Sequence, residues 1–149
     1  MAAEKTCLLY TSPSPRDTEK TYIMLKPDAM ERGLVGEILA RIERKGYKIE
    51  QIKTMQLDEP ILREHYAHIA DQPFFPDTLA YMTRGPVVAM VVSGENAVRG
   101  MRILMGATRF EDAAAGTIRG DFAHSTTENL IHGSDSPEAA AIEIARFFG

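Results

Sequence analysis

The run PVVAMVV at residues 86–92 is the feature that most constrains the fold. None of its seven residues is charged, valine dominates it, and Gly85 and Pro86 mark its start. A continuous apolar run of this length is typical of a strand that other elements cover on both faces. The sequence therefore predicts a buried strand here, to which the other segments of the chain must be fitted.

Three further segments have strand character. TYIMLK at 21–26 is ended by Pro27, which cannot continue a central ladder. YKIEQIKTMQL at 47–57 is long but alternates less regularly, and TENLI at 127–131 is a short candidate near the C-terminus. Together with the run at 86–92, these segments predict four strands.

Segments with helical spacing separate the predicted strands. In the first, apolar residues from Val35 to Ile42 recur at helical intervals, and Gly46 lies where a helix C-cap is expected. Ser136-Pro137-Glu138 has the composition of a helix start. The remaining helical segments are Leu62, His65, Tyr66 and Ile69; residues 76–85; Ala97, Val98, Met101, Leu104 and Met105; and Ala141, Ile144, Ala145 and Phe148.

The resulting order is β-α-β-(α-α)-β-α-β-α. It predicts an α+β fold of the ferredoxin-like, split βαβ type, an antiparallel four-stranded sheet with helices on one face. The 149 residues suffice for one domain, which we assign to residues 18–149. Residues 1–17 contain the proline- and serine-rich stretch TSPSPR, and we interpret them as a disordered extension or an artefact of gene prediction.

Composition excludes several classes of protein. A formal net charge of −4 disfavours a dedicated nucleic-acid binder, since phosphate backbones attract basic surfaces. No apolar run approaches the roughly 20 residues of a membrane-spanning helix, so no membrane partner is expected. Cys7 is the single cysteine, which excludes a disulfide framework and favours a cytoplasmic location. The phosphate-binding, dinucleotide-binding and hydrolase glycine motifs are all absent.

Three cationic residues and one histidine are the candidates for chemistry. Lys26 ends a strand, Arg102 flanks an apolar helix stripe, and Arg119 lies between glycines in GTIRGDF. Each residue taken alone is more often an ordinary surface charge, but together the three could form an anion pocket for a polyphosphate. His132 precedes Gly133, and a neutral imidazole is already nucleophilic near pH 7. From these residues alone, an ordinary turn histidine remains the alternative.

A metal site held by the protein is not expected. His65 and His68 are three residues apart on a predicted helix, which is a possible ligand spacing. Only one of the two falls on the apolar stripe, and no third ligand is evident from the sequence.

The chain resembles the nucleoside diphosphate kinases. NLIHGSDS at 129–136 is similar to the family's active-site signature, N-x-x-H-G-S-D. The resemblance extends over residues 18–149. Its other segments are KPD at 26–28, RGLVGEI at 32–38, REHY at 63–66, PFF at 73–75, GPVVAMV at 85–91 and GTIRGDF at 116–122.

The resemblance implies an activity. The enzyme would move the γ-phosphate of a nucleoside triphosphate, mainly ATP, to nucleoside diphosphates and so maintain the NTP and dNTP pools. The reaction would be ping-pong through a phosphohistidine at His132, with Mg²⁺ arriving bound to the nucleotide phosphates.

The resemblance also assigns roles to individual residues. Lys26 would act in catalysis and in binding, and Ser134 and Glu143 would steady His132. Helical periodicity alone would instead place Glu143 on the solvent side of its helix, opposite the apolar stripe. Phe74 would stack on the base, whereas Phe75 is expected in the core. The remaining residues implied to bind phosphates and ribose are Tyr66, Arg102, Thr108, Arg119 and Asn129.

Members of the family are homo-oligomers built from dimers, which the resemblance implies here too. The loop after Thr108, RFEDAAAG, departs from the Asn-Pro that many members carry, so the local shape of the site is expected to differ. The alternative function is a non-catalytic ferredoxin-like module that binds nucleotides or RNA. That module would need exposed aromatic residues on the sheet and a basic face.

Overall fold

A computed structural model describes residues 19–149, so the extension predicted at residues 1–17 lies outside the described residues. The strands form one antiparallel sheet in the spatial order β2-β3-β1-β4. They are β1 (Lys20–Leu25), β2 (Lys48–Met55), β3 (Val87–Ser93) and β4 (Ile131–Gly133). This arrangement confirms the predicted α+β, ferredoxin-like fold.

Strand β3 is buried at every residue and pairs with both β1 and β2, as its uninterrupted apolar sequence predicts. The expectation that helices cover only one face of the sheet is wrong. In β1, Ile23 and Leu25 pack into one hydrophobic core, whereas Tyr22 and Met24 pack into a second one. Successive side chains of a strand point to opposite faces, so a strand that is apolar throughout needs a helical layer on each side.

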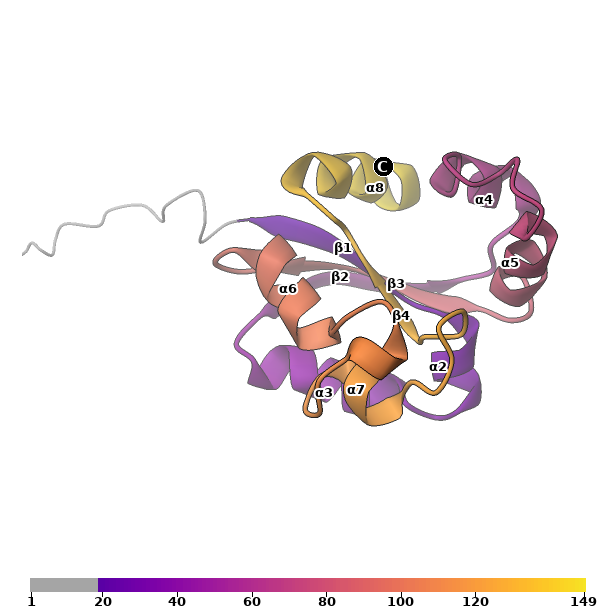
Figure 1. Cartoon of the computed structure of the whole chain (residues 1–149). Coiled ribbons are helices and arrows are strands. Elements are labelled where there is room, and N and C mark those ends of the chain that lie inside the picture. Colours follow the sequence, from indigo (N-terminus) through magenta and orange to yellow (C-terminus); the bar gives the residue numbers. More distant parts are fainter. Residues whose placement is uncertain (1–18) are drawn as a thin grey trace, which may run out of the picture.

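Figure 1 shows the two helical layers on either side of the sheet. One layer contributes to the core of Ile23 and Leu25 and consists of α2 (Pro27–Glu31), α3 (Val35–Arg44), α6 (Ala97–Met105) and α7 (Ile118–Phe122). The other consists of α4 (Glu59–His65), α5 (Phe75–Met82) and α8 (Pro137–Phe148). A short 3-10 helix, η2 (Phe110–Asp112), lies in the loop between α6 and α7.

Side-chain caps fix the start of several helices. The Ser136 hydroxyl accepts a hydrogen bond from the Ala139 amide, and Pro137 occupies the first position of α8, as the sequence predicts. The α2 and α7 helices, each of five residues, were not predicted, because so short a helix has no recognisable periodicity.

Two predicted elements differ in register from the structure. The last strand is Ile131–Gly133 rather than 127–131, so His132 lies within a strand instead of a following turn. Leu130, just before it, has φ of +78°, a conformation that is unusual for a branched residue and interrupts the extended chain there.

The buried stripe of α8 is also rotated relative to the prediction. Ala140 and Phe147 are buried, whereas Ala141 and Ala145 are exposed. Alanines occur on both sides of this helix, so the sequence does not distinguish its faces well. The rotation moves Glu143 from the expected solvent side towards the sheet.

None of the helices in residues 19–149 has the length and apolarity needed to cross a membrane.

Candidate active site

Polar side chains from both helical layers and from β4 converge on a cavity of about 210 Å³. The residues that line it are Lys26, His65, Tyr66, His68, Arg102, Thr108, Arg119, Asn129, His132, Gly133, Asp135 and Glu143. Two sets of lining residues can be distinguished by their contacts. The imidazole side consists of the imidazoles and the carboxylate that contact His132, and the cationic side consists of the lysine, arginine and amide groups that are bonded to one another and to backbone.

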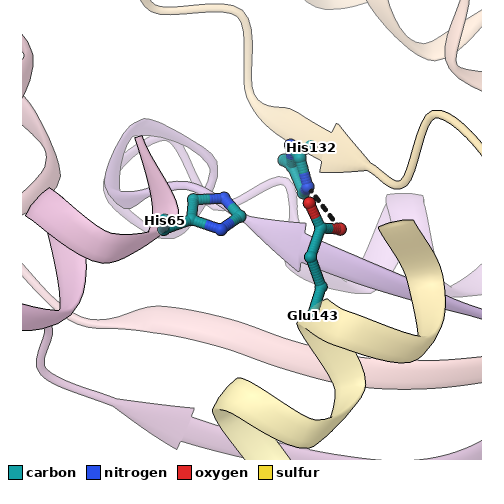
Figure 2. Close-up of side chains that lie close together, drawn as sticks. All are labelled: His65, His132 and Glu143. Carbon is teal, nitrogen blue, oxygen red and sulfur yellow. Dashed lines mark hydrogen bonds and ion pairs between the residues drawn. The ribbon is translucent and has the colours of Figure 1, made fainter. Parts of the chain in front are cut away.

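His132 occupies the middle of β4, opposite Met24 of β1, with about a fifth of its side chain exposed. Its Nε2 lies 3.1 Å from Glu143 Oε1 (Figure 2). An ionised carboxylate can only accept, so Nε2 carries the proton of the neutral ring and Nδ1 keeps its lone pair. The geometry therefore assigns the free nucleophilic nitrogen of His132 to Nδ1.

Glu143 Oε1 also accepts a 2.6 Å hydrogen bond from the Ser134 hydroxyl. Burial raises the pKa of Glu143, but the hydrogen bonds from His132 and Ser134 outweigh it and leave the pKa below its usual value. Ser134 is fully buried, and its amide donates to the carbonyl of Tyr22 on β1 at 3.2 Å. Strand pairing therefore fixes Ser134, Ser134 fixes Glu143, and Glu143 fixes the ring of His132.

A second imidazole, that of His65, stands beside this chain of hydrogen bonds. His65 is the last residue of α4, and its ring lies edge-on to that of His132 with centroids 4.8 Å apart. Arg146 donates to its Nδ1 at 3.0 Å, which places the proton of the neutral ring on Nε2. Burial, with the nearby His132, lowers the pKa of His65 to about 3, so the ring is neutral near pH 7.

On the other side of the cavity, Lys26 donates to Asn129 Oδ1 at 2.8 Å. The Asn129 amide nitrogen in turn donates to the carbonyl of Thr108 at 3.2 Å. Burial, with the nearby Arg119, lowers the pKa of Lys26 to about 8. Thr108 is thus tied through Asn129 to Lys26 at the end of β1, and it lines the cavity.

Arg119 is buried, and its guanidinium binds backbone as well as facing the cavity. It donates to the carbonyls of Gly106 at 3.0 Å, Ile131 at 2.5 Å and Asn129 at 3.4 Å. Burial, followed by repulsion from Arg102, lowers its pKa to about 10. The sequence predicted Arg119 as an anion-binding cation. The structure adds that its hydrogen bonds connect the backbone at Gly106 to the backbone at residues 129–131.

Arg102 is the most accessible of the three cations, with 40% of its side chain exposed. It donates to Asp135 Oδ1 at 2.7 Å and to the carbonyl of Gly133 at 3.2 Å. A Cβ at Gly133 would lie 2.6 Å from the sulfur of Met105, so any side chain there would require the Met105 side chain to shift. Arg102 and Asp135 also line a second hollow of about 500 Å³, whose lining includes no histidine.

The structure brings together most of the predicted site residues. Ser134 lies behind the cavity, where it supports Glu143. Phe74 does not line the cavity and is 51% exposed, whereas Phe75 is buried in the core as expected. The sequence assigned no role to His65, His68 or Asp135, although Asp135 belongs to the signature around His132, His65 lies in the segment REHY, and His65 and His68 have a possible ligand spacing. The predicted residues that line the cavity are Lys26, Tyr66, Arg102, Thr108, Arg119, Asn129, His132 and Glu143.

This arrangement is suited to one kind of reaction. An imidazole with a fixed tautomer and a free Nδ1 faces three cations that can neutralise an attacked anion. Such a pairing of nucleophile and cations matches the transfer of a phosphoryl group through the histidine.

Comparisons with known proteins identify a single family. The sequence model described as nucleoside diphosphate kinase matches residues 19–149. A curated nucleoside diphosphate kinase of Thermus thermophilus is 53% identical over 130 residues, which cover 87% of this chain and 95% of that protein. One from Exiguobacterium sibiricum is 51% identical and covers 87% and 94%.

Solved structures agree with these sequences. A halophilic nucleoside diphosphate kinase from Halobacterium salinarum, in complex with CDP, superposes with a TM-score of 0.85 at 50% identity, covering 88% of each chain. The apo enzyme from Encephalitozoon cuniculi also has a TM-score of 0.85, at 43% identity, and covers 88% of this chain and 89% of its own.

Proposed function

Because the chain belongs to the nucleoside diphosphate kinase family, it is an enzyme that transfers phosphoryl groups between nucleotides, and we propose that His132 carries the group. One observation supports this role above the others. Glu143 holds the Nε2–H of His132, so the lone pair of Nδ1 is available to attack phosphorus.

The proposed cycle has two half-reactions. Nδ1 of His132 attacks the γ-phosphorus of a nucleoside triphosphate, mainly ATP, and forms a P–N bond while the bond to the β-phosphate oxygen breaks. The nucleoside diphosphate leaves with that oxygen and its electron pair. A terminal oxygen of a second diphosphate then attacks the phosphoryl group, and the P–N bond breaks to restore Nδ1. The proton on Nε2 stays with the Glu143 hydrogen bond throughout and stabilises the charged ring.

The cations would bind the phosphates during both half-reactions. Lys26 and Arg102 line the cavity, and their charges would neutralise charge on the transferring oxygens. Arg119 would act both as a positive charge and as the clamp of the surrounding backbone. The hydroxyls of Tyr66 and Thr108 and the amide of Asn129 line the same cavity and would bind phosphate and ribose oxygens.

Mg²⁺ fits this scheme as part of the nucleotide. The carboxylates at the cavity already have partners, Asp135 with Arg102 and Glu143 with His132 and Ser134. Mg²⁺ prefers an octahedron of oxygen ligands, which the lining residues do not supply. Bound to the phosphates, the ion would offset their charge.

Phe74 is the proposed contact for the base. Its ring is half exposed at the start of α5, in the helical layer that also contains α4. Stacking on an aromatic ring does not depend on the identity of the base, which would allow the enzyme to accept many nucleosides.

Self-association is also part of the proposal. Strand β2 lies at the edge of the sheet, spans eight residues without proline, and is exposed along most of its length, with Ile52 49% exposed. An open edge of this kind favours pairing with another chain, which supports a homo-oligomer built from dimers. We place the enzyme in the cytoplasm, where it would maintain the NTP and dNTP pools.

The alternative, a non-catalytic ferredoxin-like module that binds nucleotides or RNA, is not favoured. Helices cover both faces of the sheet in the described residues, so the exposed aromatic platform that this reading needs is missing from them.

Intact mass measured after brief incubation with ATP and Mg²⁺, followed by a chase with GDP, tests the proposal. We expect one acid-labile phosphoryl adduct that the chase removes and that His132→Ala does not form. An adduct that persists in His132→Ala, or a folded protein that forms none, would contradict the role of His132. Salt-dependent binding of single-stranded RNA without nucleotide turnover would instead support the binding module.

A further inference from the structure

Three potential metal ligands lie together at the imidazole side of the cavity. One ligand atom each from His65, His132 and Glu143 falls within 4.8 Å of the other two. They come from α4, β4 and α8, of which β4 and α8 are consecutive and α4 is far away in the sequence (Figure 2). The nucleotide reaction described above uses His132 and Glu143 but gives no task to His65.

His65 is the observation that needs an explanation. Its side chain is 7% exposed, yet within the described residues its Nε2 has no hydrogen-bond partner. A buried polar atom of this kind is rare, because leaving it without a partner costs roughly 1–3 kcal/mol. Arg146 binds Nδ1, so Nε2 is the ring nitrogen left for a ligand shared with His132, and it can coordinate a cation once Arg146 releases Nδ1 and the ring proton moves there.

We propose that His65, His132 and Glu143 form a binding site for a transition-metal ion of the Zn²⁺ class, and that the bound ion inhibits phosphoryl transfer. Two imidazole nitrogens and a carboxylate oxygen are ligands typical of Zn²⁺, whereas Mg²⁺ prefers oxygen alone. The site therefore discriminates against the ion that accompanies the substrate.

The present geometry already suits part of a tetrahedral site. His132 Nε2 and Glu143 Oε1 are 3.1 Å apart, close to the separation of two ligands that each lie about 2.0–2.2 Å from one ion. His65 has to move closer to join them. It ends α4 and is followed by turns, so the shift does not break a continuous helix.

The bound ion would inhibit by changing the tautomer of His132. Coordination takes the lone pair of Nε2, so the single proton of the neutral ring moves from Nε2 to Nδ1 through solvent. Nδ1 then has no lone pair to attack phosphorus. The ion blocks the nucleophile without occupying the phosphate site itself.

Arg146 opposes metal binding. Its donation to Nδ1 keeps the proton of His65 on Nε2, the nitrogen that the ion needs, and its charge repels a cation. Glu64, 2.9 Å from Arg146 Nε, can retain the guanidinium when His65 is released. Removing the guanidinium should therefore tighten metal binding, whereas a purely structural role of Arg146 predicts no such gain.

Metal titration of the full, nucleotide-free chain tests the site without relying on catalysis. The Cys7→Ser background removes the thiol as a competing ligand. Titration with Co²⁺ should give the visible absorption of a tetrahedral complex at one ion per chain, Zn²⁺ should displace it, and Mg²⁺ should not.

Matched variants then assign the ligands. Loss of a second-shell partner alone typically costs 10–100-fold in affinity, so His65→Gln and Glu143→Gln should each weaken Zn²⁺ binding at least about tenfold. His68→Gln, three residues from His65, should leave binding unchanged, and Arg146→Met should strengthen it. Absence of a complex in the folded parent, or affinity lost in His68→Gln but retained in His65→Gln, would overturn the site.

Inhibition is tested separately. Stoichiometric Zn²⁺ in the presence of excess Mg²⁺ should abolish the phosphoryl adduct seen by intact mass, and a chelator should restore it. An adduct that still forms on the metal-bound chain would overturn the inhibitory role while leaving the binding site intact.

Discussion

The two sides of the cavity around His132 are held in place by different kinds of bonds. On the imidazole side, Ser134, Glu143 and His132 are joined side chain to side chain. On the cationic side, Arg119 is bound to backbone carbonyls, and Lys26 is bound to an amide that itself binds backbone. The bonds on the imidazole side fix which nitrogen of His132 carries the proton. Those on the cationic side hold the backbone around the cavity in place and also position its positive charges. Changes on the two sides should therefore have separable effects on chemistry and on stability.

The largest effect is expected from His132→Ala. Removing a nucleophile should lower turnover by about 10⁴-fold or more. His132 contributes little to the hydrophobic cores, so the thermal midpoint should stay close to that of the parent. Coupled-assay turnover and calorimetry measure the two quantities, and substantial residual turnover would show that another group carries the phosphate.

Glu143→Ala should lower kcat by about 10²-fold, because the His132 ring loses the partner that fixes its tautomer. The KM for nucleotide should change little, since Glu143 lies behind the nucleophile. Glu143→Gln keeps an acceptor oxygen in the same place and should recover part of the loss. Equal defects in the two variants would contradict a positioning role through Nε2, and so would a defect confined to KM.

Arg119→Met and Arg102→Met compare two cations with different partners. The first leaves the carbonyls of Gly106 and Ile131 without their Arg119 donor and that of Asn129 with the Ile131 amide alone, and it should destabilise the fold by about 3 kcal/mol. The second breaks an exposed ion pair and should cost under about 1 kcal/mol, while it raises the KM roughly tenfold. Denaturant unfolding and steady-state kinetics check both, and equal stability losses would remove the distinction between the two.

The smallest expected effect is a pH dependence of kcat/KM that comes from Lys26. Its pKa of about 8 means that it loses its charge as the pH rises through that value, so kcat/KM should fall above pH 8. Lys26→Arg should move this decline to higher pH. The stability effect has the opposite sign: between about pH 8 and the usual lysine pKa of 10.5, the unfolded chain binds more protons, so folding becomes more favourable as pH rises.

Local patterns determined much of this protein. The apolar run at 86–92 predicted a strand covered on both faces, and Ser136-Pro137 predicted the start of α8, both as observed. Contiguous motifs around His132 and Lys26 were enough to identify the family. These features depend on neighbours in the chain, so the sequence contains the whole signal.

The tertiary structure alone decided the rest. It placed Glu143 next to His132, although the alanine-rich sequence of α8 does not indicate which face of the helix is buried. It brought His65, 67 positions before His132, to its ring, and it gave Arg119 carbonyl partners from two segments, at Gly106 and at residues 129–131. Such contacts depend on how the helices pack against the two faces of the sheet. That packing follows from the burial of many side chains at once, and no single stretch of sequence encodes it.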